Sequence, residues 1–506
     1  MVKLKFFGST FRLTILFIIL TELLSFFVYW YKIVFDIQAI VFVIIISVIF
    51  LISLKDLKLG LLAALTELFI GAQGHLFNLN IGNFAISIRI GIFTVVMLAW
   101  LIWTIRKKTY RSTVNLIKSH KELIYLAAIC LWALAFALFR QNSLKDIFLD
   151  FNAWLYFLYF LPFLTIFKTQ KHLNQILQVF TASIIAISLK SIFILFIFSH
   201  KLSILRDFYR WGRDTRWGEF TLLSNNFYRI FSQSQIFILI GFFILLSYLF
   251  FKGKSNYRVK NNQYLSVVLF LLLSTIILSL SRSYWVGLFL GFILLLIVAT
   301  FIVKQKKSRL AALIIRLTFI TLLSYALIIT IINIPISFGN GFSTSGSMIT
   351  DRISISDNAV SSRWSQLPKL SKKIIKHPII GSGWGTTVTY QSQDPRILNE
   401  ENPHGWYTTY AFEWGYLDFL LKIGLLGLII YLTLLISIFK KLWDLHKKNT
   451  DRYVRALILG LMFGLFSLII VHGFSPYLNH PLGIGYLLIL LTLIPILHPK
   501  TEPTKS

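Results

Sequence analysis

Hydrophobic segments of about 20 residues recur along the whole chain, separated mostly by short polar connectors. Each segment is long enough to cross the hydrocarbon core of a bilayer, which is roughly 30 Å thick. Hydrophobic residues make up 56% of the 506 residues, which excludes a soluble globular protein with a polar exterior. The pattern predicts about fourteen transmembrane helices, at residues 11–31, 37–54, 59–78, 87–105, 122–139, 151–167, 174–198, 233–251, 263–280, 284–303, 311–334, 417–439, 454–472 and 483–498. We therefore expect an all-α polytopic membrane protein with a single integral membrane domain, residues 1–506.

The first segment follows the basic residues Lys3 and Lys5, as the hydrophobic part of a signal peptide would. It lacks a small-residue cleavage site, and a second hydrophobic segment follows at once, so we expect it to be the first transmembrane helix. The single cysteine, Cys130, lies inside a hydrophobic segment. A disulfide framework and a cysteine metal site are therefore excluded.

The formal net charge of +30 would favour nucleic-acid binding in a soluble protein. Here the basic residues gather in alternate connectors, as the positive-inside rule predicts for the cytoplasmic face. The most basic of these connectors are Arg106–Lys121, Lys252–Lys260, Lys304–Arg316 and Lys440–Arg455. The charge thus indicates topology: a multi-pass protein of the cytoplasmic (inner) membrane, with both termini cytoplasmic and no nucleic-acid partner.

Two predicted extracytoplasmic loops, 199–232 and 335–416, are much longer than the other connectors. Long loops in compact proteins are usually functional or disordered, and both of these are too rich in aromatic residues for disorder. Within the second loop, the sequence SSRWSQLPKLSKKIIK predicts an amphipathic helix. Its apolar face would contain Trp364, Leu367, Ile374 and Ile375. We expect the function to lie on this side of the membrane.

Arginines gather on this outer side, where the positive-inside rule should make them rare. Guanidinium groups form paired hydrogen bonds with phosphate and stay charged at any working pH, so the residues outline an anion site for a diphosphate. For those near Arg210, the alternative is solvated charge paired with Asp207, Asp214 and Glu219. The arginines are Arg206, Arg210, Arg213, Arg216, Arg229, Arg282 and Arg363.

Arg282 stands out because Ser281-Arg282-Ser283 interrupts a hydrophobic stretch from Tyr264 to Val303. Placing an arginine at membrane depth costs about 2.5–3.5 kcal/mol on insertion scales, so such a residue normally has a partner or a function. The alternative is that its side chain extends to the membrane interface.

Several short motifs in the second half of the chain occur together. The pattern resembles the bacterial O-antigen polymerase and ligase family, and the resemblance covers roughly Ser199 to Phe439. The Gly-Ser-Gly-Trp-Gly run is not by itself a nucleotide signature, because no strand precedes it and no helix follows in the required order, and we expect a structural turn there. The matching positions are Ser281-Arg282-Ser283, Arg363-Trp364, His377-Pro378-Ile379-Ile380-Gly381-Ser382-Gly383-Trp384-Gly385, Asn402-Pro403-His404, Tyr416-Leu417 and Gly424-Leu425-Leu426-Gly427.

The resemblance implies a GT-C-like membrane glycosyltransferase that acts on glycans linked to undecaprenyl diphosphate, both as donor and as acceptor. It assigns Arg282 and Arg363, with Arg229 as a third, to the diphosphate, where fixed positive charge would stabilise the leaving group. No cofactor is implied. No metal site is predicted either, because the histidines and loop carboxylates lack the spacing of metal ligands.

For the general base that deprotonates the acceptor hydroxyl, the resemblance points to a histidine of the large loop, and we assign His404. The family's histidine and asparagine ahead of the Tyr-Leu pair are replaced here by Glu413 and Trp414. A carboxylate of raised pKa also serves as a base, so Glu413 is the alternative.

The favoured function is polymerisation of lipid-linked O-antigen or exopolysaccharide repeats on the outer face of the membrane. A ligase that moves the glycan to a lipid A core shares the same motifs and is the first alternative. A lipid-linked oligosaccharide flippase or other transporter is the second, although transporters place their sites near mid-membrane on broken helices. A flippase and a chain-length regulator are candidate protein partners.

Overall fold

The computed structural model describes residues 4–31, 37–82, 84–222, 227–253, 259–335, 358–392, 397–398 and 402–498, and these residues are mostly α-helical. The first half contains α1 (Ser9–Tyr31), α2 (Gln38–Lys55), α3 (Leu57–Ile70), α4 (Ile88–Arg106), α5 (Tyr110–Lys118), α6 (Lys121–Phe139), α7 (Leu144–Phe151), η1 (Trp154–Tyr159), α8 (Phe160–Ile166), α9 (Gln170–Ser199) and α10 (Leu205–Asp214). The second half contains η2 (Gln233–Gln235), α11 (Ile236–Phe251), α12 (Val259–Ser279), α13 (Arg282–Ile297), η3 (Val298–Ile302), α14 (Lys307–Asn333), α16 (Asn358–Ile374), α17 (Gly415–Lys448), α18 (Arg452–His472) and α19 (Pro481–Leu497). The predicted all-α polytopic class is confirmed.

Strands occur, within the described residues, as three separate antiparallel hairpins. Each joins two strands of four residues in direct register: Asn78 pairs with Ser87, Glu219 with Phe231 and Val388 with Thr409. The hairpins are β1 (Asn78–Ile81) with β2 (Phe84–Ser87), β3 (Glu219–Leu222) with β4 (Tyr228–Phe231), and β5 (Val388–Gln391) with β6 (Trp406–Thr409).

Every predicted transmembrane segment overlaps a helix of the structure. Twelve helical segments of the described chain are long and apolar enough to cross a membrane. The two that fall short of the expected fourteen are α3, with 14 residues, and α19, with 17. The predicted segment 59–78 ends early because α3 stops at Ile70, where the chain turns at Gly71 and continues along the end of the bundle.

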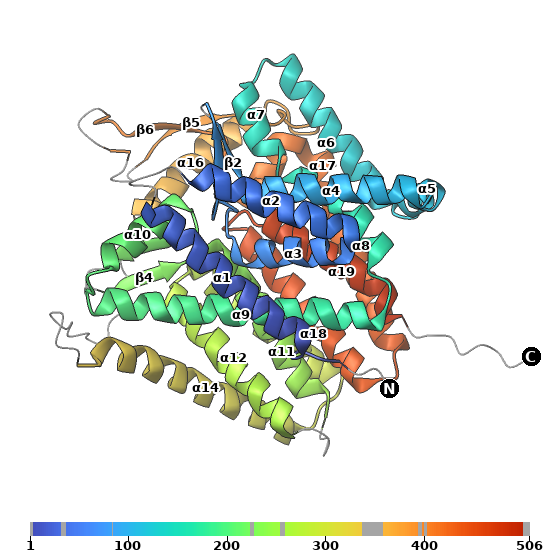
Figure 1. Cartoon of the computed structure of the whole chain (residues 1–506), viewed down its shortest axis with the longest axis vertical. Coiled ribbons are helices and arrows are strands. Elements are labelled where there is room, and N and C mark those ends of the chain that lie inside the picture. The colour runs from blue at the N-terminus through green and yellow to red at the C-terminus, as the bar shows by residue number, and fades with distance from the viewer. Residues whose placement is uncertain are drawn as a thin grey trace, which may run out of the picture.

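The helices lie side by side, and their connectors form two opposite faces (Figure 1). One face, here called the loop face, carries α10, the three hairpins and α16. The opposite, basic face carries α5 and both ends of the described chain. Asn449, between α17 and α18, donates to the Leu497 carbonyl at 2.9 Å, and Phe6 packs against Tyr248 at 4.9 Å. The helices therefore cross the bundle an even number of times.

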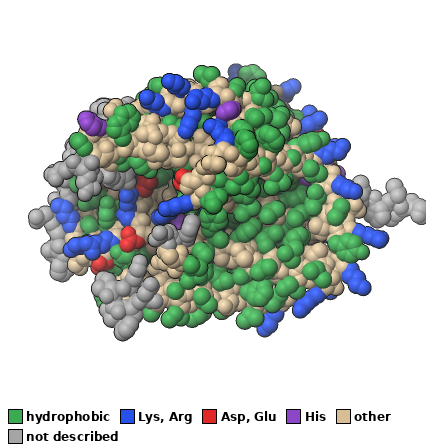
Figure 2. Space-filling model, turned by 90° about the horizontal axis from the view of Figure 1, so that it is seen from above, with side chains coloured by type: hydrophobic (Ala, Val, Ile, Leu, Met, Phe, Trp, Pro, Cys, Tyr) green, Lys and Arg blue, Asp and Glu red, His purple; other side chains and the backbone are tan. Residues whose placement is uncertain are grey.

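Burial separates central helices from those that face lipid. The hydrophobic part of α11 is 83% buried and that of α18 is 72% buried, whereas α1, α2 and α14 reach 22% at most. Gly460 lets α18 approach α11 closely, since a Cβ there would lie 2.7 Å from the Ile244 Cα. Figure 2 shows the broad hydrophobic surface between the basic right-hand edge and a hollow on the left, where basic and acidic side chains gather.

The predicted structural turn at Gly381–Gly385 packs against a break in α17. Gly424 has φ 68 and ψ −174, so the helix is interrupted there. The turn supplies the missing backbone partners: the Ser382 and Gly383 amides donate to the Leu421 and Lys422 carbonyls at 2.6 and 3.0 Å. Irregular backbone at membrane depth is tolerated where protein surrounds it in this way.

Charged side chains within the helices pair with one another. Lys422 lies 2.5 Å from Asp150 and 2.6 Å from Asp418, and all three side chains are less than 10% exposed. Arg89 forms two bonds of 3.0 Å to the Glu67 carboxylate. Ion pairing of this kind is the usual way in which charge is kept inside a membrane protein.

The predicted amphipathic helix of the large loop is α16, and its predicted apolar face is confirmed only in part. Ile374 packs against a small core, and Leu370, which was not assigned to that face, is fully buried. Trp364 and Ile375, assigned to the apolar face, are 60% and 74% exposed. The buried side is set by the small core that α16 forms with β5 and the start of α17. This tertiary contact could not be predicted from the sequence pattern alone.

Candidate functional site

The first loop is fastened to the bundle by a buried lysine. Lys190 on α9 pairs with Glu22 on α1 at 2.6 Å, and its ammonium group lies over the rings of Trp211 and Trp217, at 4.3 and 3.7 Å. Such cation–π contacts gain strength when they are removed from water. The contacts hold the end of α10 and the start of the β3–β4 hairpin against the loop face.

The hairpin brings Arg229 to the connector that contains Arg282. Arg229 lies on β4, and its Nε donates to the Ser279 carbonyl at 3.0 Å. Ser279 closes α12 and Arg282 is the first residue of α13, so both arginines belong to one end of the bundle. The intervening Leu280 has a left-handed backbone, with φ 45, which turns the chain sharply between the two helices. Two of the three predicted diphosphate residues are thus assembled here.

The connector between α18 and α19 forms another wall of this region. The Ser475 hydroxyl lies 3.2 Å from that of Ser283, and the Tyr477 hydroxyl lies 2.5 Å from that of Tyr284. The Tyr284 hydroxyl also donates to the Gln233 carbonyl at 3.5 Å. None of these serines and tyrosines is marked as a site residue by the sequence. Their types are ordinary, and each pair is separated by about 190 positions.

Arg363 and Glu413, predicted to have different roles, form an ion pair in the large loop. The indole of Trp414 donates to the Arg363 carbonyl at 3.1 Å, which fixes α16 to the start of α17. The Trp414 ring also lies 6.3 Å from that of Phe474. Trp414, which follows Glu413, thus adjoins the α18–α19 connector, which contacts Ser283 and Tyr284 beside Arg282 in the sequence.

His404 lies elsewhere on the large loop. It is exposed, in the turn that precedes β6. The turn closes through the Ser392 amide, which donates to the Gly405 carbonyl at 2.7 Å. β6 lies between His404 and Glu413 along the chain, and its four residues alone extend for about 13 Å at roughly 3.3 Å each. The structure thus brings Glu413 together with Arg363 and leaves His404 at the far end of the β5–β6 hairpin.

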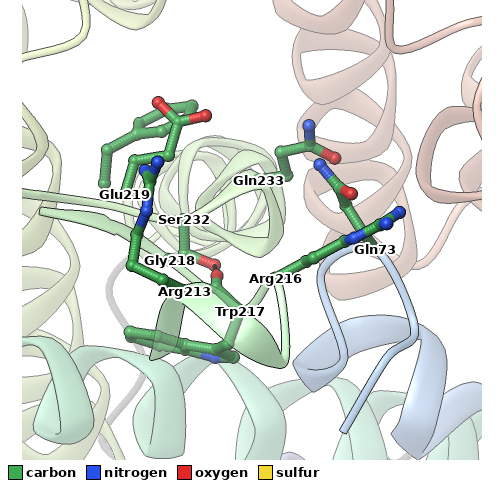
Figure 3. Close-up of a pocket in the computed structure, with 9 residues that line it drawn as sticks. Gln73, Arg213, Arg216, Trp217, Gly218, Glu219, Ser232 and Gln233 are labelled. Carbon is green, nitrogen blue, oxygen red and sulfur yellow. Dashed lines mark hydrogen bonds between the residues drawn. The ribbon is translucent and has the colours of Figure 1, made fainter. Parts of the chain in front are cut away.

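A cavity of about 190 Å³ lies beside the β3–β4 hairpin, next to Arg229. In Figure 3, Arg213 and Glu219 line one side of it, and Arg216, Gln73 and Gln233 the other. Trp217, Gly218, Phe231 and Ser232 complete the lining. Arg206 and Arg210, which the sequence grouped with Arg213 and Arg216, are exposed on α10 and are not among the residues that line the cavity.

Arg213 and Arg216 supply the positive charge of the cavity lining. Burial, and then the neighbouring Arg216 guanidinium, lower the pKa of His75 to about 4, so this histidine is neutral at pH 7. Burial and the Asp150 carboxylate raise the pKa of Tyr410, which keeps that phenol protonated. The positive potential near the cavity therefore persists across the physiological pH range. Among the described residues, no group of three or more His, Cys, Asp or Glu is placed to hold a metal ion.

Comparison with known proteins supports the family resemblance. Residues 267–432 match the family model described as O-antigen ligase, a range that contains Arg282, Arg363, His404 and Glu413. A ComP-specific O-oligosaccharyltransferase of Acinetobacter baylyi is 29% identical over 260 residues. That match covers 51% of this chain and 40% of the relative, less than half of its length. Both findings favour a glycan-transferring membrane enzyme over a transporter.

Proposed function

We propose that this chain, whose residues 267–432 belong to the O-antigen ligase family, transfers a glycan from a lipid diphosphate donor at the loop face of the membrane. The observation that carries the proposal is the meeting of Arg229 and Arg282 at one connector, through the 3.0 Å bond from Arg229 to Ser279. Arginine is costly at membrane depth and forms paired bonds with phosphate. Arg229, held by this backbone contact, and Arg282, three residues beyond Ser279, are together suited to a diphosphate.

In the proposed reaction, an acceptor hydroxyl oxygen bonds to the anomeric carbon of the donor sugar. The bond from that carbon to the diphosphate oxygen breaks, and its electron pair leaves with the lipid diphosphate. Arg229 and Arg282 stabilise the negative charge on the leaving group, with Arg363 as the third cation. The proton of the acceptor hydroxyl passes to a carboxylate or imidazole of the large loop.

For the base, the geometry favours Glu413 over His404. Glu413 lies beside Arg363 and, through Trp414 and Phe474, close to the Arg282 region. His404 would have to move from the tip of the β5–β6 hairpin. In the resting arrangement, Arg363 holds the Glu413 carboxylate. Binding of the diphosphate to Arg363 would release that carboxylate for proton transfer.

We assign the loop face to the extracytoplasmic side of the cytoplasmic membrane, because the connectors of the opposite face are rich in lysine and arginine. Lipid-linked repeats have to reach this side before they react. The proposed reaction therefore requires a flippase, and a chain-length regulator is a second protein partner.

Polymerisation, with a second lipid-linked glycan as acceptor, is the first proposal for the overall reaction. The family description favours a second candidate, a ligase that transfers the glycan to a lipid A core. The name of the A. baylyi relative specifies ComP and so adds a protein acceptor as a third. Gel electrophoresis of the products would distinguish the three candidate reactions. A ladder on the lipid carrier, a modified lipid A core and a glycosylated protein have different mobilities.

The diphosphate assignment is tested by Arg282→Gln and Arg229→Gln in a strain that lacks the wild-type chain. Removal of one donor that stabilises developing charge typically lowers the rate by about 10²–10³. We expect each variant to lose the glycan product while the protein still inserts into the membrane. Arg206→Gln, at an exposed arginine of α10, is the matched control and should keep full activity. Normal product from both test variants would refute the diphosphate assignment.

A further inference from the structure

The cavity beside the β3–β4 hairpin has a common wall with the proposed diphosphate site. Phe231 lines the cavity, and its ring lies 4.7 Å from the Arg229 guanidinium carbon and 5.7 Å from the Tyr284 ring. Gln233, another lining residue, accepts the hydrogen bond from the Tyr284 hydroxyl. A group in the cavity would therefore lie next to a diphosphate held by Arg229 and Arg282.

The cavity is equipped for a negatively charged polar ligand. Within the part of the chain that the structure describes, no ion pair joins Arg213 or Arg216 to Asp207, Asp214 or Glu219. The alternative that the sequence left open, solvated charge in pairs, is therefore not seen for these two arginines. Two guanidinium groups against the single Glu219 carboxylate leave one net positive charge.

The remaining polar groups match hydroxyl chemistry. The Gln73 and Gln233 side chains each offer both donors and acceptors, and the Glu219 carboxylate accepts from hydroxyls. The Trp217 and Phe231 rings supply apolar lining. The cavity, of about 190 Å³, has room for one sugar ring.

The turn that contains Arg216 is held closed by backbone contacts. Arg216 has φ 51, the left-handed conformation that costs an ordinary residue about 1–2 kcal/mol. The Trp217 and Gly218 amides both donate to the Gly212 carbonyl, at 3.0 and 3.2 Å, and keep this turn closed. Trp217 is itself fully buried against Lys190. Backbone strain of this kind, held by surrounding contacts, is concentrated at binding sites.

We infer that this cavity binds one acidic sugar of the glycan, with its carboxylate on Arg216 and its hydroxyls on Gln73, Gln233 and, on the opposite side, Glu219. This inference rests on the proposed function, which places the diphosphate next to the cavity. A neutral ring would leave the excess guanidinium charge uncompensated. A uronic acid supplies the counter-charge together with ring hydroxyls, and the bidentate fork of arginine matches its carboxylate.

The test measures binding to the full-length protein in nanodiscs by saturation-transfer NMR, with D-glucuronate, D-glucose and inorganic pyrophosphate as probes. We expect glucuronate to bind at least about tenfold more tightly than glucose, because of its charge-assisted bonds. Arg216→Gln should remove this preference. Arg216→Lys should restore only part of it, since it keeps the charge and loses the fork. Arg206→Gln is the matched control and should bind all probes as the wild type does.

Equal binding of glucuronate and glucose by the wild type, or an unchanged preference in Arg216→Gln, would overturn the acidic-sugar assignment. So would an equal loss of pyrophosphate and glucuronate binding in Arg216→Gln, because the cavity would then hold the diphosphate. Arg282→Gln separates the two proposals: it should weaken pyrophosphate and leave glucuronate unaffected. If Arg282→Gln leaves pyrophosphate binding intact, the proposed function fails, whatever the cavity binds.

Discussion

Replacement of Lys422 by methionine should destabilise the protein strongly. The Lys422 ammonium lies between Asp150 and Asp418 at 2.5 and 2.6 Å, and its side chain is only 3% exposed. Asp150 also accepts the Gly385 amide at 2.9 Å, and Asp418 accepts the Asn479 amide at 2.6 Å. The cluster thus joins α7, the turn beside α17 and the α18–α19 connector.

Removal of one partner from a buried ion pair costs about 3–5 kcal/mol, because a buried charge is left uncompensated. Lys422→Met leaves two carboxylates facing each other, so we expect the upper part of this range. The matched control is Lys441→Met, also on α17, whose pair with Glu122 has a longer distance of 3.3 Å and side chains 39% and 22% exposed. Pairs that are accessible to water contribute about 0–1 kcal/mol.

Thermal unfolding in detergent, followed by the size-exclusion retention of a fluorescent fusion, would measure the contrast. Lys422→Met should unfold many degrees below the wild type, and Lys441→Met close to it. The triple variant Lys422→Met, Asp150→Asn, Asp418→Asn should recover part of the loss, because it removes the buried carboxylates as well. Equal unfolding temperatures for Lys422→Met and Lys441→Met would refute the reasoning.

Two further predictions concern topology and the general base. A cysteine at Thr408 should react with a membrane-impermeant maleimide from the extracytoplasmic side, and a cysteine at Lys447 only from the cytoplasmic side. The buried Cys130 should not react. The reverse pattern would contradict the assigned orientation. At matched expression, Glu413→Gln should lower glycan transfer by about 10²–10⁴ while His404→Ala keeps measurable activity. Loss of transfer in the histidine variant alone would return the base to His404.

The helices could be predicted from the sequence because lipid exposure imposes a simple pattern. A helix that spans the hydrocarbon core has to be apolar over roughly 20 residues, whichever neighbours it packs against. Each predicted segment therefore overlaps a helix. The pattern fails where protein and not lipid surrounds the chain: α3 ends at Ile70, and the turn at Gly71 is stabilised by Arg89, which bonds to the Ala72 carbonyl at 2.7 Å.

The sequence predicted that arginines on the outer side have a function, but it did not predict which of them lie together in the structure. Arg282 was evident because a charge in an apolar stretch is costly wherever its side chain points. The ion pair of Arg363 with Glu413 was not evident, since the two residues lie 50 positions apart and their types suggested different roles. A helix such as α11, apolar on every side, contains no periodicity that fixes which face meets which neighbour.

The cavity shows most clearly why the remaining contacts could not be predicted. Its lining combines Gln73 with residues 213–219 and 231–233, and glutamines occur in loops of every kind. A glycine at position 216 would have indicated the left-handed turn. An arginine there indicates only charge, because the strain becomes visible when φ is measured. The Arg216 side chain determines which ligand the cavity can bind, and the left-handed backbone at Arg216 determines where that side chain lies. A binding site for an acidic sugar therefore cannot be predicted from either one alone.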